Sequence, residues 1–155
     1  MSGKKPDEQS SRLLGFQCLG SFMRARGDEP PAQSQLRKSM PVVWWGSPVE
    51  VHSAISRLHR VGKLKDVEKQ GALSRLALLS RGWREILPGD QLRDLAMRLL
   101  DAYELRTADS LQLAAALIWC QQRPARRIFV CADQRLSKAA AAAGFTVFEL
   151  SRVVP

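Results

Sequence analysis

The chain has 155 residues, of which 45% are hydrophobic and 25% charged, a balance that indicates one folded domain with a sizeable core. The net charge of +9 predicts a polyanionic partner, most simply nucleic acid, although a merely soluble basic protein or one that pairs with an acidic protein would also fit. Three cysteines without a CxxC pair and only two histidines argue against a zinc site and a disulfide framework, and predict a reducing cytoplasm. We expect no signal peptide and no membrane span, because the apolar runs are too short.

The front of the chain is less regularly patterned than the rest. Residues 1–12 are polar and predict a disordered tail. Residues 13–23, LLGFQCLGSFM, could form a strand, but they contain two glycines and show no clean period. Residues 24–39 are rich in Arg, Pro, Gln and Ser and predict a loop. We therefore expect a single domain over residues 13–155, of which residues 13–40 are atypical.

From Pro41 onward, short apolar runs alternate with segments whose apolar residues recur at helical spacing. Continuous apolar runs are typical of strands that are buried on both faces. Strand, helix and strand in close succession predict βαβ units and therefore a parallel sheet. The predicted elements are, in chain order, strand Val42–Trp45, a helix from an N-cap at Ser47 to Gly62, helix Val67–Leu79, strand Trp83–Leu87, a helix capped by Asp90, a helix capped by Thr107, strand Ile128–Cys131, helix Gln134–Ala143 and strand Phe145–Leu150.

The stretch LRTADSLQLAAAL, residues 105–117, places one carboxylate on an otherwise apolar helix. With Thr107 as N-cap, Asp109 lies in the first turn, where the helix dipole favours a negative charge. Because Asp109 shares a helical face with Leu113, we expect it to point inward, and a buried carboxylate must be paired or must hold a cation. The alternative is an acid that only stabilises the helix end.

Three carboxylates stand out by position: Glu50 and Asp109 each open a helix, and Asp133 follows the strand IFVC. Ligand sites in an open α/β sheet form outside the carboxyl ends of its strands, so these acids could converge there. Hard oxygen ligands suit Mg²⁺ or Mn²⁺, which would hold a phosphodiester and activate a water. Each acid also has a plainer interpretation, since Glu50 is in register for a capping box with Ser47 and Asp133 can cap the helix after it.

These segments resemble the PIN-domain ribonucleases and, among them, the VapC toxins of toxin–antitoxin pairs. The likeness rests on VVWWGSPVEVHSAISRL, LRTADSLQLAAAL and FVCADQRLSKAAAAAGFTVF, whose order and spacing match the family over residues 41–150. It implies a Rossmann-like α/β fold, a central parallel sheet flanked by helices, and metal-dependent RNA cleavage by three or four acids. Glu50, Asp109 and Asp133 fall on the family's second, third and fourth acidic positions, and are thereby implied as catalytic residues and ligands of Mg²⁺ or Mn²⁺. The resemblance also implies a homodimer and a cognate antitoxin protein as partners.

The family's first acidic position has no counterpart in this chain. Family members begin with an apolar strand that ends in Asp, whereas residues 13–23 contain neither Asp nor Glu. Back-translated and read one nucleotide later, this segment is compatible with W-D-S-S-A-L-V, which resembles the missing motif. We hypothesise that the front of the chain is out of frame relative to an intact parent gene, and that the frame is restored before Pro41.

Three interpretations of function remain open from the sequence. The first is a VapC-like endoribonuclease that is impaired because the first-strand Asp is absent. The second is a non-catalytic module that binds RNA or an antitoxin without cutting, and the third is a structural α/β domain whose acids are helix caps. We interpret Trp44 and Trp45 as core residues rather than as platforms on which bases stack.

Overall fold

Within the part of the chain that the structure describes, five parallel strands form one sheet in the order β3-β2-β1-β4-β5. The structure is a computed structural model that describes residues 12–14 and 41–149. A strand begins at Arg12, one residue inside the predicted tail, and the predictions for the rest of the tail, for most of segment 13–40 and for the last residues lie outside the described residues. The order is that of a doubly wound sheet, in which the chain moves outward from β1 to β3 and then returns to the other side of β1. The strands are β1 (Arg12–Leu14), β2 (Pro41–Trp44), β3 (Arg84–Ile86), β4 (Ile128–Cys131) and β5 (Thr146–Glu149).

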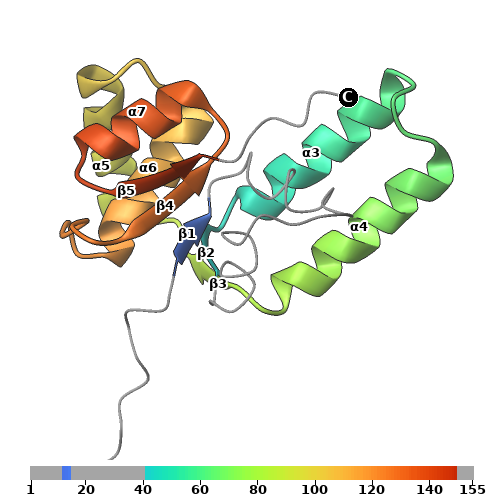
Figure 1. Cartoon of the computed structure of the whole chain (residues 1–155), viewed down its shortest axis with the longest axis horizontal. Helices are drawn as coiled ribbons and strands as arrows, with labels where there is room; N and C mark the ends of the chain where they lie inside the picture. The colour runs from blue at the N-terminus through green and yellow to red at the C-terminus, as the bar shows by residue number, and fades with distance from the viewer. Residues whose placement is uncertain (1–11, 15–40, 150–155) are drawn as a thin grey trace, which may run out of the picture.

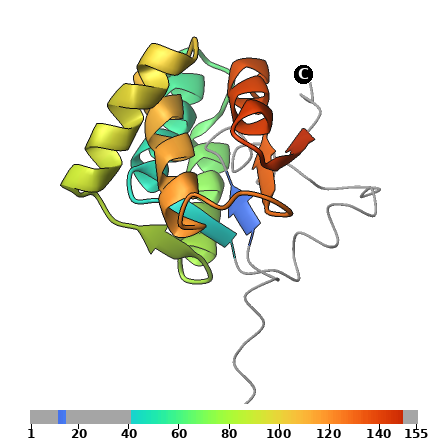
Figure 2. The same ribbon diagram turned by 90° about the vertical axis from the view of Figure 1, so that its left-hand side faces the viewer.

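Helices cover both faces of this sheet, as Figure 1 shows. One side carries α3 (Ser47–Arg60) and α4 (Asp66–Ser80), which pack against each other as a projecting pair. The opposite side carries α5 (Asp90–Ala102), α6 (Thr107–Trp119) and α7 (Gln134–Ala142), which stand in front of α3 and α4 in Figure 2. The predicted α/β class, a parallel sheet flanked by helices, is therefore confirmed. None of the helices in this part of the chain has the length and apolar content needed to cross a bilayer.

The predicted elements from β2 onward are all present, but three of the predicted helix caps are wrong. Each of these helices begins one residue earlier than the sequence pattern suggested, so the supposed cap lies inside the first turn and a residue without a capping side-chain bond precedes it. A capping residue has non-helical backbone angles that direct its side chain to the N–H groups of the second and third helical residues, whereas a residue at the first helical position lacks that conformation. The observed N-caps are Gly46, Gly89 and Arg106, in place of Ser47, Asp90 and Thr107.

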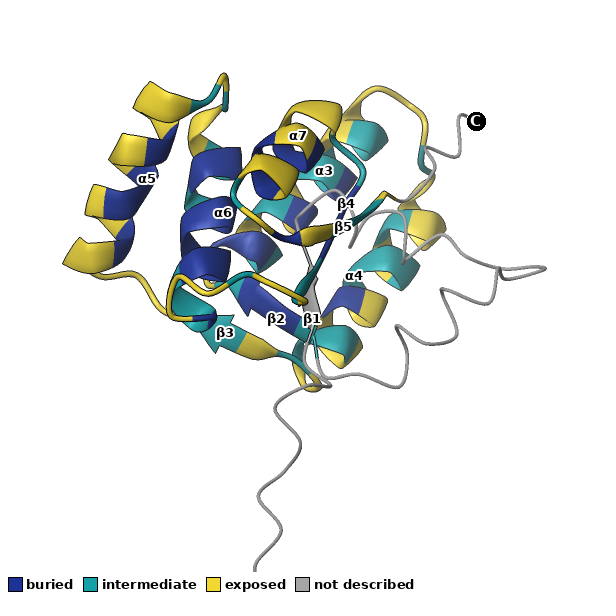
Figure 3. Cartoon of the chain, turned by 60° about the vertical axis from the view of Figure 1, so that its left-hand side comes forward, coloured by how far each residue is buried: buried dark blue, intermediate teal, exposed yellow. Residues whose placement is uncertain are grey.

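Two clusters of buried side chains hold the layers together. The larger joins β2 and β4 to α5, α6 and α7, and the smaller joins β2 to α3 and α4. Val42 belongs to the larger cluster and Val43 to the smaller, because successive strand residues face opposite sides of a sheet. Figure 3 shows α6 as the most completely buried helix, and the small residues Ala114, Ala115 and Ala116 let its neighbours approach on several sides.

The two neighbouring tryptophans differ in their burial, and α4 has a narrow inward face. Trp44 is half-buried and packs against the larger cluster, but Trp45 is 49% exposed, so its interpretation as a core residue is wrong. In α4 the inward face is narrow, because Leu76 is buried while the next residue, Ala77, is exposed. Little of that helix therefore contacts the core.

Leu113 offers a test of the larger cluster, since it lies in the middle of α6 with 0% of its surface exposed. Leu113→Ala should lower the free energy of unfolding by about 3 kcal/mol, because it removes buried apolar surface and leaves a cavity. Urea unfolding followed by circular dichroism measures this loss. Leu78→Ala on α4, where Leu78 is 65% exposed, is the matched control and should change stability by less than about 0.5 kcal/mol. Equal losses in the two variants would contradict this packing.

Candidate acidic site at the carboxyl edge of the sheet

The three candidate carboxylates are placed along one edge of the sheet. Glu50 lies in the first turn of α3, directly after β2, and Asp133 directly follows β4. Asp109 lies in the first turn of α6, and because the far end of α6 leads into β4, its beginning is at the carboxyl edge. The strand between β2 and β4 is β1, where the strand order reverses. Doubly wound sheets bind their ligands at this point.

Asp109 points inward, as predicted, and is only 9% exposed. Its pKa is raised, chiefly because burial penalises the charged carboxylate and secondly because of the negative charge of Asp133. A backbone hydrogen bond at Arg106 and the positive charges of Arg106 and Arg135 lower the pKa by less. The surroundings of Asp109 therefore disfavour its charged form, and an added cation would stabilise that form.

Glu50 does not belong to a capping box, so that interpretation is wrong. Its Oε1 accepts a hydrogen bond of 3.1 Å from the indole Nε1 of Trp44, and its Oε2 accepts one of 2.8 Å from the amide Nε2 of Gln112. Burial raises the pKa of Glu50 most, these two hydrogen bonds lower it, and the charge of Asp109 raises it further. The side chain thus turns away from its own helix end and toward α6.

Asp133 is the N-cap of α7, which confirms its plainer interpretation. Its Oδ1 accepts hydrogen bonds from the backbone N–H groups of Arg135, at 2.9 Å, and Leu136, at 3.1 Å. Capping does not remove Asp133 from the site, because its charge is one of the causes that raise the pKa of Asp109. The same carboxylate thus caps a helix and adds to the negative potential of the edge.

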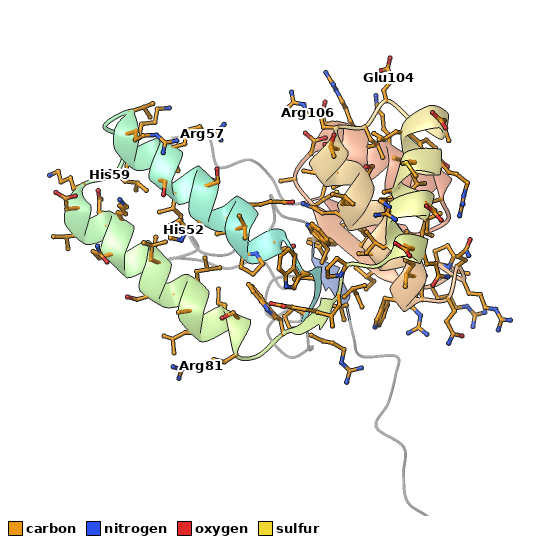
Figure 4. All side chains as sticks on the ribbon, turned by 180° about the vertical axis from the view of Figure 1, so that it is seen from behind. His52, Arg57, His59, Arg81, Glu104 and Arg106 are labelled. Atoms are coloured by element: carbon orange, nitrogen blue, oxygen red, sulfur yellow. The ribbon has the colours of Figure 1, made fainter. Side chains whose placement is uncertain are left out.

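Asp109 interacts electrostatically with Glu50 and with Asp133, yet the three acids do not form a closed cluster. Within residues 12–14 and 41–149, no three His, Cys, Asp or Glu side chains lie close enough to hold a metal ion. The chemistry of the donors nevertheless suits Mg²⁺ or Mn²⁺, since all three supply carboxylate oxygens. Both histidines lie along α3, away from the beginning of α6 where Figure 4 labels Arg106. A softer ion that prefers nitrogen or sulfur is therefore not favoured at this edge.

A buried hydroxyl lies one helical turn before Glu50. Ser47 is fully buried, and its Oγ has no hydrogen-bond partner among the described residues. Leaving such a group unsatisfied costs about 1–3 kcal/mol, and a water or a hydrated ion beside Glu50 would supply a partner. This hydroxyl and the carboxylate donors together fit a hydrated Mg²⁺ or Mn²⁺.

A cysteine nucleophile is not supported at this edge, although Cys131 ends β4 close to Asp133. The Sγ of Cys131 lies 3.0 Å from Ser137 Oγ, and both cysteines of the described residues are buried and free. Burial raises the pKa of Cys131 to about 11, so its reactive thiolate form is scarce at neutral pH.

Sequence reasoning missed the two side chains that bind Glu50, Trp44 and Gln112. One signal was available for Gln112, which follows Asp109 by three residues and so shares its helical face. Gln112 is 5% exposed, which makes it a buried polar residue that must find a partner. The identity of that partner, 62 residues away along the chain, could not be read from the sequence.

Comparisons with known proteins establish the fold but no family. No protein-family model matches the chain, and no curated protein matches it. The chain is similar to the crystal structure of PAE2754 from Pyrobaculum aerophilum, with a TM-score of 0.64 and 13% sequence identity over 90% of each chain. The two chains share a fold. At this level of identity the likeness carries no statement about activity.

The raised pKa of Asp109 predicts how stability depends on pH. A carboxyl whose folded-state pKa exceeds its unfolded value stabilises the fold below the unfolded value and loses that contribution as the pH rises through the folded value. Asp109→Asn should therefore melt a few degrees above the wild type at about pH 7 in EDTA, and the difference should shrink toward about pH 4. Thermal melts across this range provide the measurement. The control, Asp101→Asn at an exposed position of α5, should follow the wild type, and an Asp109→Asn chain less stable than wild type at pH 7 would contradict the assignment.

Proposed function

We propose that this chain is built on the plan of the PIN-domain ribonucleases of the VapC type, with Glu50, Asp109 and Asp133 as ligands of Mg²⁺ or Mn²⁺. The observation that carries the proposal is that three separate elements deliver carboxylates to one edge of a doubly wound parallel sheet. Burial and neighbouring negative charge raise the pKa of both Glu50 and Asp109. Gathering like charges in this way is unfavourable unless a cation joins them.

The chemistry of this site would be hydrolysis of an RNA phosphodiester. A bound divalent ion polarises a phosphoryl oxygen and lowers the pKa of a bound water. The chain's own contribution is to hold the carboxylates and to attract the polyanion, for which the net charge of +9 is suited. Arg106 and Arg135 are exposed and act electrostatically on Asp109, so they can contact phosphate oxygens beside the acids.

Activity is expected to be impaired in this chain because the first-strand acid is absent. The central strand β1 pairs with β2 through Leu13 and Val42 and with β4 through Leu14 and Val130. In the shifted reading frame the Asp codon starts within the codon of Gly15, immediately after β1 in the chain. The missing acid would thus follow β1. This strand lies between β2, which precedes Glu50, and β4, which precedes Asp133. We propose weak metal binding and little ribonuclease activity at physiological Mg²⁺, with a homodimer and a cognate antitoxin as partners by the same resemblance.

A non-catalytic module that binds RNA or an antitoxin is the second candidate. It is favoured by the absence of a closed three-acid cluster among the described residues and by the lack of any acid in residues 13–23. Under this alternative the net positive charge still attracts a polyanionic or acidic partner, while the carboxylates serve only the local structure. The two candidates differ in whether Asp109 affects metal binding.

Mn²⁺ binding to the purified full chain, measured by isothermal titration calorimetry, tests the proposal. The wild type should bind Mn²⁺ weakly, and Asp109→Asn should weaken binding at least about tenfold because it removes a charged ligand. Asp101→Asn is again the control and should bind as the wild type does. Absence of Mn²⁺ binding by the wild type, or equal binding by Asp109→Asn, would favour the non-catalytic alternative.

Restoring the first acid should raise both metal affinity and cleavage. Gly15→Asp places a carboxylate where the shifted frame encodes one, so Mn²⁺ should bind more tightly and a fluorogenic RNA oligonucleotide should be cut in a metal-dependent manner. Gly15→Asn, which has the same size without the charge, is the matched control. Cleavage that survives Asp109→Asn in the Gly15→Asp background would argue against this site. The fully frame-restored chain gives the same test with the whole motif W-D-S-S-A-L-V.

A further inference from the structure

Two neutral donors hold the carboxylate of Glu50, one at each oxygen. The indole of Trp44, at the end of β2, donates to Oε1 at 3.1 Å, and the amide of Gln112, on α6, donates to Oε2 at 2.8 Å. A carboxylate has about four lone-pair positions, so both oxygens keep acceptor capacity after these bonds. These two bonds, both from uncharged donors, thus fix the plane of the carboxylate.

The amide of Gln112 is itself held in place by its surroundings. Gln112 is 5% exposed and lies next to Leu113, which is 0% exposed, on the most buried helix. It shares its helical face with Asp109, three residues earlier. The bond from Gln112 to Glu50 therefore fixes the beginning of α3 relative to the helix that carries Asp109.

The indole of Trp44 depends on a glycine two residues later. A Cβ atom added to Gly46 would overlap the Trp44 ring, so the ring rests directly against the Gly46 backbone. Trp45 adds an edge-on contact, with ring centroids 6.1 Å apart at an interplanar angle of 70°. Because glycine has no side chain at position 46, the N–H of Trp44 can approach the first turn of α3 this closely.

We propose that Trp44 and Gln112 are positioning residues that orient Glu50 for the divalent ion it shares with Asp109. This inference rests on the proposed function, and it assigns a role to two residues that have no carboxylate and are not metal ligands themselves. Partners of this kind, which hydrogen-bond to a metal ligand, fix its orientation, and removing them costs about 10- to 100-fold in metal affinity. If the two donors served stability alone, their loss would lower the melting temperature and leave metal affinity unchanged.

The experiment compares Mn²⁺ dissociation constants of the full chain by isothermal titration calorimetry, with melting temperatures in EDTA measured in parallel. Gln112→Met keeps the length of the side chain and removes the donor, and Trp44→Phe removes the indole N–H. Trp83→Phe is the matched control, because Trp83 Nε1 also donates to a glutamate, Glu85 Oε1, at 3.0 Å and away from the acidic edge. We expect a dissociation constant at least about tenfold higher for Gln112→Met and for Trp44→Phe, and less than about twofold higher for Trp83→Phe.

Each outcome decides between the proposals. Wild-type binding with unchanged dissociation constants in Gln112→Met and Trp44→Phe would overturn the positioning role and leave the proposed function intact. Absence of Mn²⁺ binding by the wild type would overturn the proposed function and the positioning role with it. Equal weakening by Trp83→Phe would show a general effect of stability and would also overturn the role. Should Gln112→Met fail to fold, Trp44→Phe against Trp83→Phe carries the test alone.

Discussion

Negative charge held close together and partly out of water is the constraint around which this site is built. Burial is the largest cause of the raised pKa of both Glu50 and Asp109, and each is raised further by a neighbouring carboxylate. The fold limits this cost with N–H donors from an indole and an amide at Glu50, and with a backbone hydrogen bond at Arg106 for Asp109. The neutral donors to Glu50 favour its charged form without cancelling that charge, and a divalent cation requires charged carboxylates as ligands.

Much of the fold was predictable because hydrophobic periodicity reports local structure directly. The apolar run that ends in Cys131 and the spacing of Leu92, Leu95 and Leu99 define a buried strand and an amphipathic helix without any knowledge of their partners. The inward direction of Asp109 was predictable for the same reason, since it shares a face with Leu113. The cap at Asp133 followed from its position directly before a helical segment.

What could not be predicted depends on contacts between segments far apart in the chain. Ser47 and Glu50 have the spacing of a capping box, but α6 lies against β2 and brings Gln112 to Glu50, so a long-range bond replaces the local one. Trp45 reads as a core residue beside two valines, yet β2 ends at Trp44 and the next residue turns outward. The bounds of the first strand could not be predicted for another reason, because residues 13–23 contain two glycines and show no clean period.

The unequal size of the two buried clusters has a consequence for how the chain opens. Among the described residues, the cluster under α3 and α4 has four buried members, to which α4 contributes one: Val43, Val51, Ile55 and Leu76. Local opening costs least where few apolar contacts are broken, so backbone amides of α4 should exchange with solvent before those of α6. The projecting helix pair can therefore loosen while the helices that carry Asp109 and Asp133 stay closed. The placement of Asp109 thus rests mainly on the side of the sheet that holds α5, α6 and α7, whereas Glu50, on α3, is tied to that side by its bond to Gln112.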